Sequence, residues 1–342
     1  MIIYITDEYE GRLLRSYLKL TLGLSTAVLA KLKNHEQGIL VNGERVTVRY
    51  VLHAGDCLEL WDRDTTETAS EHVIPVHLPL DVLYEDDHVI ALNKPADMPT
   101  HPSHGHLEDT LGNALAYRYA ASNEPFVFRP LGRLDRNTSG VVVAGKTRAA
   151  SGCLGRSLKE GMVVKRYIAL LSGEMPVDGD VHTLIAPIYR PDERGICRAV
   201  GTSDTPGAVY AETRYRVLDA GDGLSLVLCR PITGRTHQLR VHLSHLGHPI
   251  LGDDLYGTTS PLIGRHALHA LSLSVPMPFT GKERLLSNEA MDAVTTLNAP
   301  SPDGYLHTLA PLPEDMLEIL QRHFPTSPLL HPSSDLLSLL QI

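Results

Sequence analysis

The sequence predicts an α+β protein: a mixed, largely antiparallel central sheet with flanking helices, preceded by a small α+β unit. Two observations support this fold class. Most apolar runs are short and are bounded by Gly, Asp and Asn, as strands are. Neighbouring runs are also joined by tight turns, such as residues 219–223, which favours antiparallel pairs because no crossover helix intervenes. The pattern therefore argues against a doubly wound parallel sheet.

The composition is that of a folded protein with more than one domain. The chain has 342 residues, of which 43% are hydrophobic, and this excludes a disordered, collagen-like or coiled-coil protein. At about 100 to 200 residues per domain, two or three domains fit this length. The four cysteines, at positions 57, 153, 197 and 229, are too widely spaced for a disulfide framework or a zinc knuckle, so we expect free thiols.

The start of the chain carries acidic residues where a signal peptide has basic residues and then an apolar run. Nowhere does the sequence approach the roughly 18 consecutive apolar residues that a membrane-spanning helix needs. We therefore expect a cytoplasmic protein that does not enter a membrane.

Residues 1–64 are expected to form the small unit. The spacing of apolar residues predicts a helix over residues 13–22 and a second one after Ser25, whose hydroxyl can cap it. The dipeptide Asn42-Gly43 accepts the backbone angles of a tight hairpin. Strands are expected at residues 39–41, 44–48 and 57–61.

Residues 65–78 are rich in Thr, Glu and Asp, lack an apolar period and are expected to form a linker. The larger unit is expected to span residues 79–324, and the Pro-, Ser- and Leu-rich tail 325–342 to be weakly ordered. Its strands are expected at residues 89–92, 140–144, 167–171, 212–218, 224–229 and 267–274. Its helices are expected at residues 110–121, 149–159 and 235–246.

The charge of the chain is unevenly distributed. A net charge of −9 argues against a nucleic-acid partner, yet positions 129 to 170 hold nine basic residues and two acidic ones. Such a stretch is either a solvated face or a binding site for a polyanion. The basic residues are Arg129, Arg133, Arg136, Lys146, Arg148, Arg156, Lys159, Lys165 and Arg166.

The densest polar segment of this stretch, residues 132–140, reads Gly-Arg-Leu-Asp-Arg-Asn-Thr-Ser-Gly and precedes an apolar strand. The plain interpretation is a turn whose polar side chains bond their own backbone. Asp135 weakens that interpretation, because it is a single carboxylate among three arginines, at positions 129, 133 and 136, that would keep it ionised at neutral pH. An ionised carboxylate beside phosphate-binding cations suits chemistry on a nucleotide.

A second polar segment, residues 231–243, contains a Thr-Gly turn followed by a predicted helix, which Thr236 is expected to cap. Arg240 lies four residues after Thr236 and so shares its face of the helix. A guanidinium binds a carboxylate through two parallel hydrogen bonds, which makes Arg240 a candidate partner for a carboxylate elsewhere in the chain. The alternative is an ordinary surface salt bridge.

Four histidines, at positions 237, 242, 245 and 248, raise the question of a metal site. Only His242 and His245 have a spacing that faces one way on a helix, and no carboxylate lies among the four. We therefore expect no metal site, and interpret these histidines, His237 included, as bonding to the backbone or to nucleic acid.

Three segments together resemble the motifs of the RluA-type pseudouridine synthases, in the same order. They are Gly-Arg-Leu-Asp-Arg-Asn-Thr-Ser-Gly at 132–140, Lys-Arg-Tyr-Ile-Ala-Leu at 165–170 and Gly-Arg-Thr-His-Gln-Leu-Arg-Val-His-Leu at 234–243. Further matches lie at 93–96, 101–102, 247–253 and 268–270, so that the resemblance runs from about residue 80 to residue 322. Residues 10–62 are similar to the small RNA-binding domain named for ribosomal small-subunit protein four.

The chain departs from these patterns at three places. Gly132 stands where the family most often has His, and Asp97 replaces a glycine of the first motif. The second helix of the small domain commonly begins Ser-Arg, whereas here it begins Ser25-Thr26. The first two changes remove no reacting group, whereas the third removes an arginine that is common at the start of this helix.

The resemblance implies a pseudouridine synthase fold and an RNA pseudouridine synthase, an isomerase that breaks the bond between uracil N1 and the ribose, turns the base and rejoins it through C5. No cofactor is implied. The essential aspartate corresponds to Asp135, which would either attack the anomeric carbon or take the neighbouring 2′ proton, and the sequence leaves both open. Tyr167 would stack on the uracil, although a strand tyrosine by itself suggests core packing. Arg240 would pair with Asp135.

The same resemblance implies that the target base is flipped out of its stack, with Arg133 helping to displace it. The partner would be RNA, with large-subunit ribosomal RNA favoured over transfer RNA, and no obligate protein partner is implied. The other residues expected to bind RNA are Arg129, Arg136, Lys146, Arg148, Lys165, Arg166, Arg235 and His237.

Two functions of other classes remain as alternatives. A non-catalytic RNA-binding assembly factor would keep this fold without turnover, and the presence of Asp135, Tyr167 and Arg240 argues against it. A metal hydrolase would use the histidines. Release of tritium from C5 of labelled uracil distinguishes the isomerase from the binding protein, and activity that survives chelation excludes the hydrolase.

Overall fold

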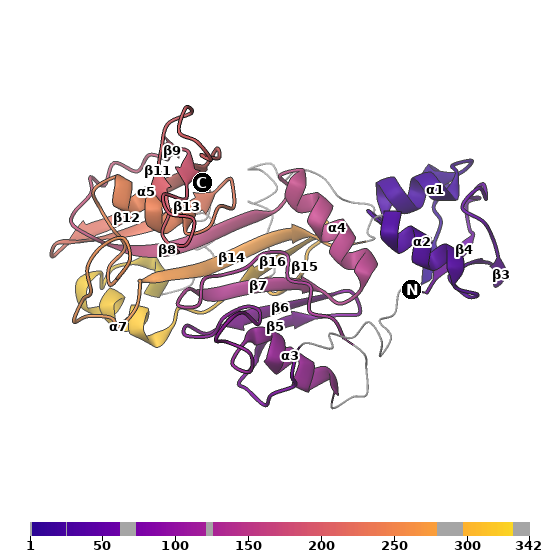
Figure 1. The fold of residues 1–342 in the computed structure, drawn as a ribbon, viewed down its shortest axis with the longest axis horizontal. Helices are drawn as coiled ribbons and strands as arrows, with labels where there is room; N and C mark the ends of the chain where they lie inside the picture. Colours follow the sequence, from indigo (N-terminus) through magenta and orange to yellow (C-terminus); the bar gives the residue numbers. More distant parts are fainter. Residues whose placement is uncertain (1, 25, 62–72, 121–125, 279–296, 331–342) are drawn as a thin grey trace.

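The structure is a computed structural model that describes residues 2–24, 26–61, 73–120, 126–278 and 297–330. The N-terminal residues form a small unit at one end of the molecule, beside a larger unit built on one long sheet (Figure 1). Within the described ranges, no helix is both long and apolar enough to cross a membrane. All four cysteines are free thiols, as the sequence predicted.

The N-terminal unit has a four-stranded antiparallel sheet in the order β1-β4-β2-β3, made of β1 (Ile2–Tyr4), β2 (Ile39–Val41), β3 (Glu44–Arg45) and β4 (Cys57–Leu60). The expected hairpin at Asn42-Gly43 is confirmed, with a positive φ at both residues. The expected first helix is divided into α1 (Leu14–Ser16) and a wider π turn (Tyr17–Thr21), and α2 (Thr26–Asn34) follows. Apolar residues of these elements form a core, which Ala149 of the larger unit joins.

The expected mixed, largely antiparallel sheet is confirmed in the larger unit, where the main strand order is β5-β6-β7-β14-β8-β13-β12-β9. Within the described sheet, β7 and β14 pair in parallel and the other neighbours pair antiparallel. The strands are β5 (Asp81–Glu85), β6 (Val89–Lys94), β7 (Ser139–Gly145), β8 (Val164–Ser172), β9 (His182–Ile185), β12 (Glu212–Gly221), β13 (Leu224–Pro231), β14 (Leu268–Pro276), β15 (Ala299–Pro300) and β16 (Tyr305–Leu309). A separate pair is β10 (Ile188–Tyr189) with β11 (Ala199–Val200).

Two helices cover opposite faces of the sheet at β7 (Figure 1). Alternate residues of a strand point to opposite faces, so Val141 and Val143 pack with α4 (Arg148–Lys159), whereas Val142 and Ala144 pack with α3 (Leu111–Ala120). Helix α4 begins at a cap in which the Thr147 hydroxyl accepts a hydrogen bond from the backbone N–H of Ala150. Because β7 is buried on both faces, it is a rigid support for the loop that precedes it.

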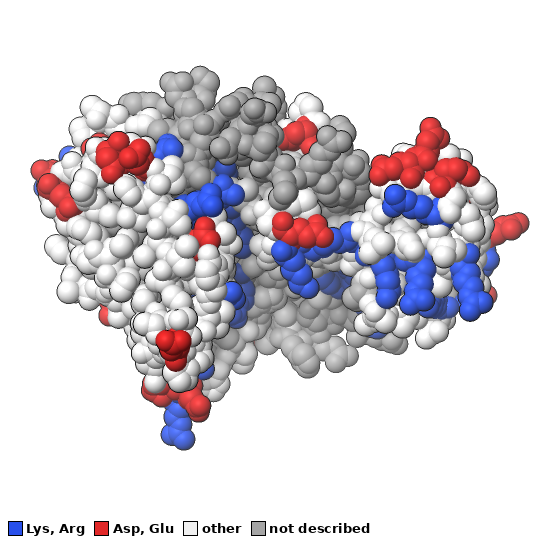
Figure 2. Space-filling view, turned by 90° about the horizontal axis from the view of Figure 1, so that it is seen from above, with Lys and Arg blue, Asp and Glu red and all other residues white. Residues whose placement is uncertain are grey.

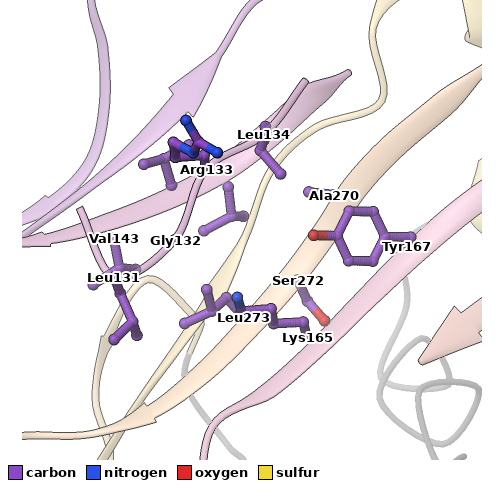
Figure 3. A pocket seen from close by; sticks show the side chains of 12 residues that line it. Leu131, Gly132, Arg133, Leu134, Val143, Lys165, Tyr167, Ala270, Ser272 and Leu273 are labelled. Carbon is purple, nitrogen blue, oxygen red and sulfur yellow. The ribbon is translucent and has the colours of Figure 1, made fainter. Parts of the chain in front are cut away.

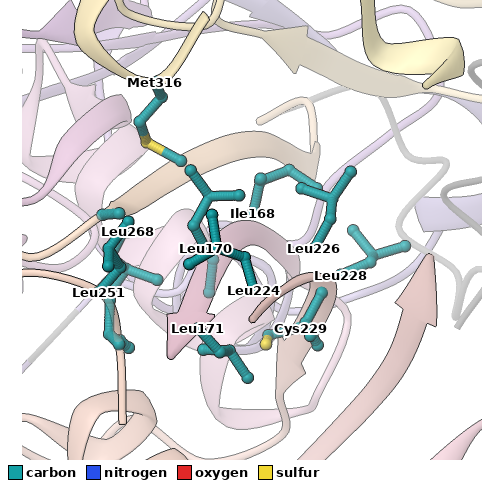
Figure 4. Packing of buried hydrophobic residues seen from close by; sticks show 14 of the residues in the cluster. Ile168, Leu170, Leu171, Leu224, Leu226, Leu228, Cys229, Leu251, Leu268 and Met316 are labelled. Carbon is teal, nitrogen blue, oxygen red and sulfur yellow. The ribbon is translucent and has the colours of Figure 1, made fainter. Parts of the chain in front are cut away.

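A second core lies where β8, β13 and β14 meet α5 (Gln238–His245) and α7 (Glu314–His323) (Figure 4). Leu170, Leu226 and Leu268 lie at its centre. Leu329, in the short turn Pro328–Leu330, packs against the same core. The chain therefore remains packed against the larger unit as far as residue 330, although a weakly ordered tail was expected from residue 325. The rest of the expected tail lies outside the described residues, as does most of the expected linker.

Gly140 fixes the start of β7 against β14. It pairs with Ala270, has a φ of 112°, and a Cβ built on it would lie 2.2 Å from the carbonyl oxygen of Ala270. A side chain cannot occupy that space, and glycine is the residue that tolerates this φ. The glycine therefore lets the loop that ends in Asn137-Thr138-Ser139 lie directly against β14.

Candidate active site

Asp135 lies in the loop before β7, where residues distant in the sequence come together. Its Oδ2 is 3.6 Å from Nη1 of Arg240 and 3.9 Å from Nε2 of His237, both of which come from the start of α5. The Asp135 side chain is 32% exposed, whereas that of Arg240 is 5% exposed. The carboxylate thus faces solvent in front of a buried cation, and a substrate can reach it.

Arg240 is held by a second carboxylate, Asp253. Its Nε and Nη2 donate to Asp253 Oδ2 and Oδ1 at 2.8 and 2.7 Å, and the Asp253 side chain is fully buried. The two parallel hydrogen bonds expected of this arginine are therefore made to Asp253. The remaining guanidinium nitrogen, Nη1, faces Asp135. Burial opposes the charge of both groups, but their mutual hydrogen bonds outweigh it, raising the pKa of Arg240 and lowering that of Asp253.

His237 adopts the left-handed backbone conformation, with a φ of 56°, directly before α5. Its Nδ1 is 2.8 Å from the hydroxyl of Tyr256, and that hydroxyl also accepts a hydrogen bond from the backbone N–H of Arg198. In the tautomer that carries its proton on Nε2, His237 accepts from the Tyr256 hydroxyl through Nδ1 and directs the Nε2 proton toward Asp135. Burial lowers the pKa of His237, which favours this neutral form.

The expected cap at Thr236 is wrong. Helix α5 begins at Gln238, and the side-chain oxygen of Gln238 turns back to accept bonds from the backbone N–H of Arg235 and the hydroxyl of Thr233. These contacts close the turn in place of a Thr236 cap. The sequence pattern located the helix but not the residue that closes its first turn.

A pocket opens next to the loop that carries Asp135, and Leu134 of that loop lines it (Figure 3). Tyr167 and Lys165 enter it from one face of β8, and Arg133 and Leu134 enter it from the loop that carries Asp135. Burial, together with the nearby Asp135, raises the pKa of Tyr167 and so keeps its hydroxyl protonated. The remaining residues that line the pocket are Leu131, Gly132, Val141, Val142, Val143, Ala270, Ser272 and Leu273.

The residues expected to bind RNA differ in their contacts and in their distance from the pocket. Arg133 is exposed at the pocket, and Arg136 is exposed in an ion pair with Asp97 at 2.6 Å. Lys146 donates to Glu85 and to the carbonyl of Asp86 at 2.9 and 2.7 Å. Three others lie apart from the pocket: Arg129 donates to the carbonyl of Val127, Arg235 donates to the carbonyl of Tyr210, and Arg148 begins α4.

The expectation that Arg166 binds RNA is wrong. Arg166 follows Lys165 and precedes Tyr167 on β8, so its side chain points to the opposite face of the sheet from those two pocket residues. It is only 2% exposed. Burial, and the neighbouring Arg230, lower its pKa to about 9. Its position in the basic stretch of the sequence therefore does not place it on the surface.

Lys94, which carried no assigned role, supports the loop of Asp135. Its buried ammonium donates to the carbonyls of Pro95, Met98 and Arg136 at 2.7, 2.7 and 3.0 Å. The hydroxyl of Thr100 donates to the carbonyl of Leu134, which fixes the other side of Asp135. The sequence signal for Lys94 was its place in the first family motif, and that for Asp253 was its place at the end of the segment 247–253.

Two buried histidines hold the end of the same loop. His266 Nε2 is 2.8 Å from the Thr138 hydroxyl, and His269 Nδ1 is 2.9 Å from that of Ser139. His242 is also internal, with its ring nitrogens 2.9 Å from the Thr213 hydroxyl and the Ala186 carbonyl. Among the residues that the structure describes, no three His, Cys, Asp or Glu side chains are grouped as metal ligands would be.

Acid is expected to destabilise the fold through His269. Burial lowers the pKa of His269 from 6.5 to about 4, so between these pH values the unfolded chain binds a proton that the folded chain does not. The contribution of neutral His269 to the free energy of unfolding is complete above pH 6.5 and is lost as the pH falls toward 4. Urea unfolding at pH 7.5 and 5.0 should show a smaller acid-induced loss for His269→Gln than for the wild type. The exposed His104→Gln is the control, and an equal loss in all three proteins would contradict this role.

Comparisons with known proteins identify the family. A family model described as RNA pseudouridylate synthase matches residues 88–245. The "Uncharacterized RNA pseudouridine synthase YjbO" of Bacillus subtilis is 38% identical over 80% of this chain and 90% of its own. The "Ribosomal large subunit pseudouridine synthase D" of Zymomonas mobilis is 34% identical over 82% of this chain and 91% of its own. The chain belongs to the RNA pseudouridylate synthase family.

The chain is therefore an RNA pseudouridine synthase, an isomerase. The solved structure titled "Human RNA Pseudouridylate Synthase Domain Containing 4" shares the fold, with a TM-score of 0.50 over 71% of this chain and 92% of that one, at 24% sequence identity. The expected fold class and enzyme class are both confirmed.

Proposed function

We propose that this enzyme isomerises uridines of large-subunit ribosomal RNA and that Asp135 is its catalytic carboxylate. The observation that carries the catalytic assignment is the position of Asp135, 3.6 Å from the buried Arg240 and beside the pocket that Tyr167 lines. The choice of RNA is supported by relatives from Zymomonas mobilis and Nitrosomonas europaea named ribosomal large subunit pseudouridine synthase D, which are 34% and 35% identical.

In this proposal Asp135 either attacks the anomeric carbon or removes the 2′ proton of the ribose. Both routes need an ionised oxygen, and the Nη1 of Arg240 favours ionisation through its charge. Because Asp253 binds the other side of the guanidinium, that charge stays in place when Asp135 reacts. No atoms are gained or lost in the isomerisation.

The base has to leave its stack before Asp135 can reach the ribose. Unstacking costs a few kcal/mol, which contacts from the pocket can offset. Arg133 is exposed at the pocket mouth, where a guanidinium can take the space of the displaced base or bind its phosphate. Tyr167 presents its ring inside the pocket, where a uracil can stack (Figure 3).

The N-terminal unit is proposed to be an RNA-binding domain of the ribosomal small-subunit protein four type, over residues 1–64, followed by the linker 65–78 and the catalytic domain 79–324. It has its own antiparallel sheet and its own apolar core, as an independent domain does. It also carries exposed basic side chains, Arg12, Arg15, Lys31 and Lys33 among them.

The proposal is tested with bulk RNA from a strain that lacks this gene, labelled with tritium at uracil C5. The enzyme should release tritium from this RNA, and the release should come from the large-subunit ribosomal fraction after the RNA is separated by size. Release from the transfer RNA fraction alone would contradict the proposed substrate. No release from any fraction would contradict the proposed activity.

Tyr167→Ala should lower turnover by about 100-fold or more, because the flipped base loses its stacking partner, worth on the order of 1 to 3 kcal/mol, and its position beside Asp135. Tyr167→Phe keeps the ring and should retain more activity than Tyr167→Ala. Single-turnover tritium release at saturating enzyme measures both. Equal activity of Tyr167→Ala and the wild type would show that the ring does not contact the base.

A further inference from the structure

Helix α4 is the surface on which the N-terminal unit packs. The Cys153 thiol of α4 lies 3.0 Å from the carbonyl oxygen of Leu22, and Arg156 donates to the carbonyl of Lys19 at 3.2 Å. Ala149, also on α4, is fully buried in the apolar core of the N-terminal unit. The unit therefore makes both polar and apolar contacts with this helix, in addition to its covalent connection.

Two glycines, Gly23 and Gly152, face each other in this contact. A Cβ built on Gly152 would lie 2.9 Å from the carbonyl oxygen of Gly23, and one built on Gly23 would lie 2.9 Å from that of Gly152. Backbone atoms at such a distance cannot move aside as the end of a side chain can. A Cβ added to Gly155, one turn further along α4, would meet no heavy atom within 4 Å, so the packing constrains Gly152 and not Gly155.

Helix α4 is connected at both ends to strands that form the pocket. It follows β7, which begins just after the Asp135 loop, and it precedes β8, which carries Lys165 and Tyr167. It also packs on β7 and β14 through Leu154. A unit that packs on α4 is therefore held at a fixed distance from the pocket.

The same helix carries Arg148, Arg156 and Lys159, which lie eight and three residues apart and so share one face. The N-terminal unit, residues 1–64, has eight basic and nine acidic residues. In the view of Figure 2, Lys and Arg side chains of the unit lie side by side across its middle, and further patches of Lys and Arg, with an acidic patch beside one of them, lie on the neighbouring part of the larger unit. Acidic side chains of the unit lie mainly toward its edges in this view.

We infer that the N-terminal unit and α4 form one continuous RNA-binding face, which binds a stem of the substrate RNA beside the flipped uridine. This inference rests on the proposed function. A line of basic side chains fits the regular phosphate backbone of an RNA helix. Because the face is held at a fixed distance from the pocket, it determines which uridine, counted from the stem, reaches Asp135.

The test compares Gly152→Leu with the matched control Gly155→Leu. Both changes replace a glycine of α4 with a better helix former, so neither should unfold the helix. Only Gly152→Leu inserts a side chain between α4 and the N-terminal unit. Cys153, which is 6% exposed in this contact, reports separation through its rate of alkylation, measured by mass spectrometry with the more exposed Cys57 as internal reference.

Gly152→Leu should raise the alkylation rate of Cys153 at least tenfold and raise KM at least tenfold on the C5-tritiated bulk RNA, with kcat within about twofold. Gly155→Leu should change neither. The inference is overturned if Gly152→Leu exposes Cys153 without raising KM, if both variants raise KM equally, or if Cys153 of the wild type reacts as fast as Cys57. A wild type that releases no tritium contradicts the proposed function instead.

Discussion

Asp135→Asn is expected to lower pseudouridine formation by at least about 10³-fold. The substitution keeps the size of the side chain but removes the ionised oxygen that either attacks the sugar or accepts its 2′ proton. The carboxylate is partly exposed and its contact with Arg240 is long, at 3.6 Å, so the fold should tolerate the change. RNA binding, measured by filter retention, should stay within a few fold of the wild type.

The matched control is Asp97→Asn. Asp97 is an exposed carboxylate, 75% accessible, that pairs with Arg136 of the same loop as Asp135. It lies in a left-handed backbone conformation, which asparagine also tolerates. Loss of this ion pair should leave turnover within about twofold. A similar loss in both variants would mean that the charge of this region, rather than the Asp135 oxygen, supports the reaction.

Arg240→Ala is expected to abolish turnover and to lower the free energy of unfolding by about 3 to 5 kcal/mol. It leaves Asp253 as a fully buried carboxylate without its cation, and breaking a buried pair at one side has a cost of this order. Arg240→Lys keeps the charge but cannot make the two parallel bonds, so it should recover part of the stability at most. Urea unfolding and single-turnover tritium release measure the two effects.

The double variant Arg240→Met with Asp253→Leu separates the two roles of this pair. Replacing both partners by apolar residues leaves no unpaired charge, so part of the stability lost in Arg240→Ala should return. The return should be incomplete, because the backbone N–H groups of Leu255 and Tyr256 lose the Asp253 oxygen that accepts from them. Turnover should remain lost, because no guanidinium faces Asp135. A double variant that is stable and fully active would show that Arg240 serves the fold alone.

The sequence predicted those parts of the protein that depend on local patterns. The Asn42-Gly43 hairpin, the position of α4 and the strand that follows residues 132–140 are set by neighbouring residues, and the structure confirms them. The contact between Asp135 and Arg240 joins distant segments, and the sequence indicated it only through the family resemblance.

The remaining features depend on three-dimensional packing. Arg166 is basic and lies between two pocket residues, yet the alternation of β8 turns it to the opposite face. Asp253 binds Arg240 because the turn after α5 brings it against that helix, and only the family segment 247–253, not composition or spacing, distinguishes it from its exposed neighbour Asp254. Lys94 and His269 act through backbone carbonyls and hydroxyls of other segments, which a single sequence does not reveal.

The most direct test of the central role of Asp135 is a map of pseudouridines in large-subunit ribosomal RNA by chemical labelling. Four strains are compared: the wild type, the deletion, and the deletion complemented with either the wild-type gene or Asp135→Asn at equal protein levels. At least one pseudouridine should disappear in the deletion, return with the wild-type gene and stay absent with Asp135→Asn. Its return with Asp135→Asn would contradict the assignment of Asp135 as the catalytic carboxylate.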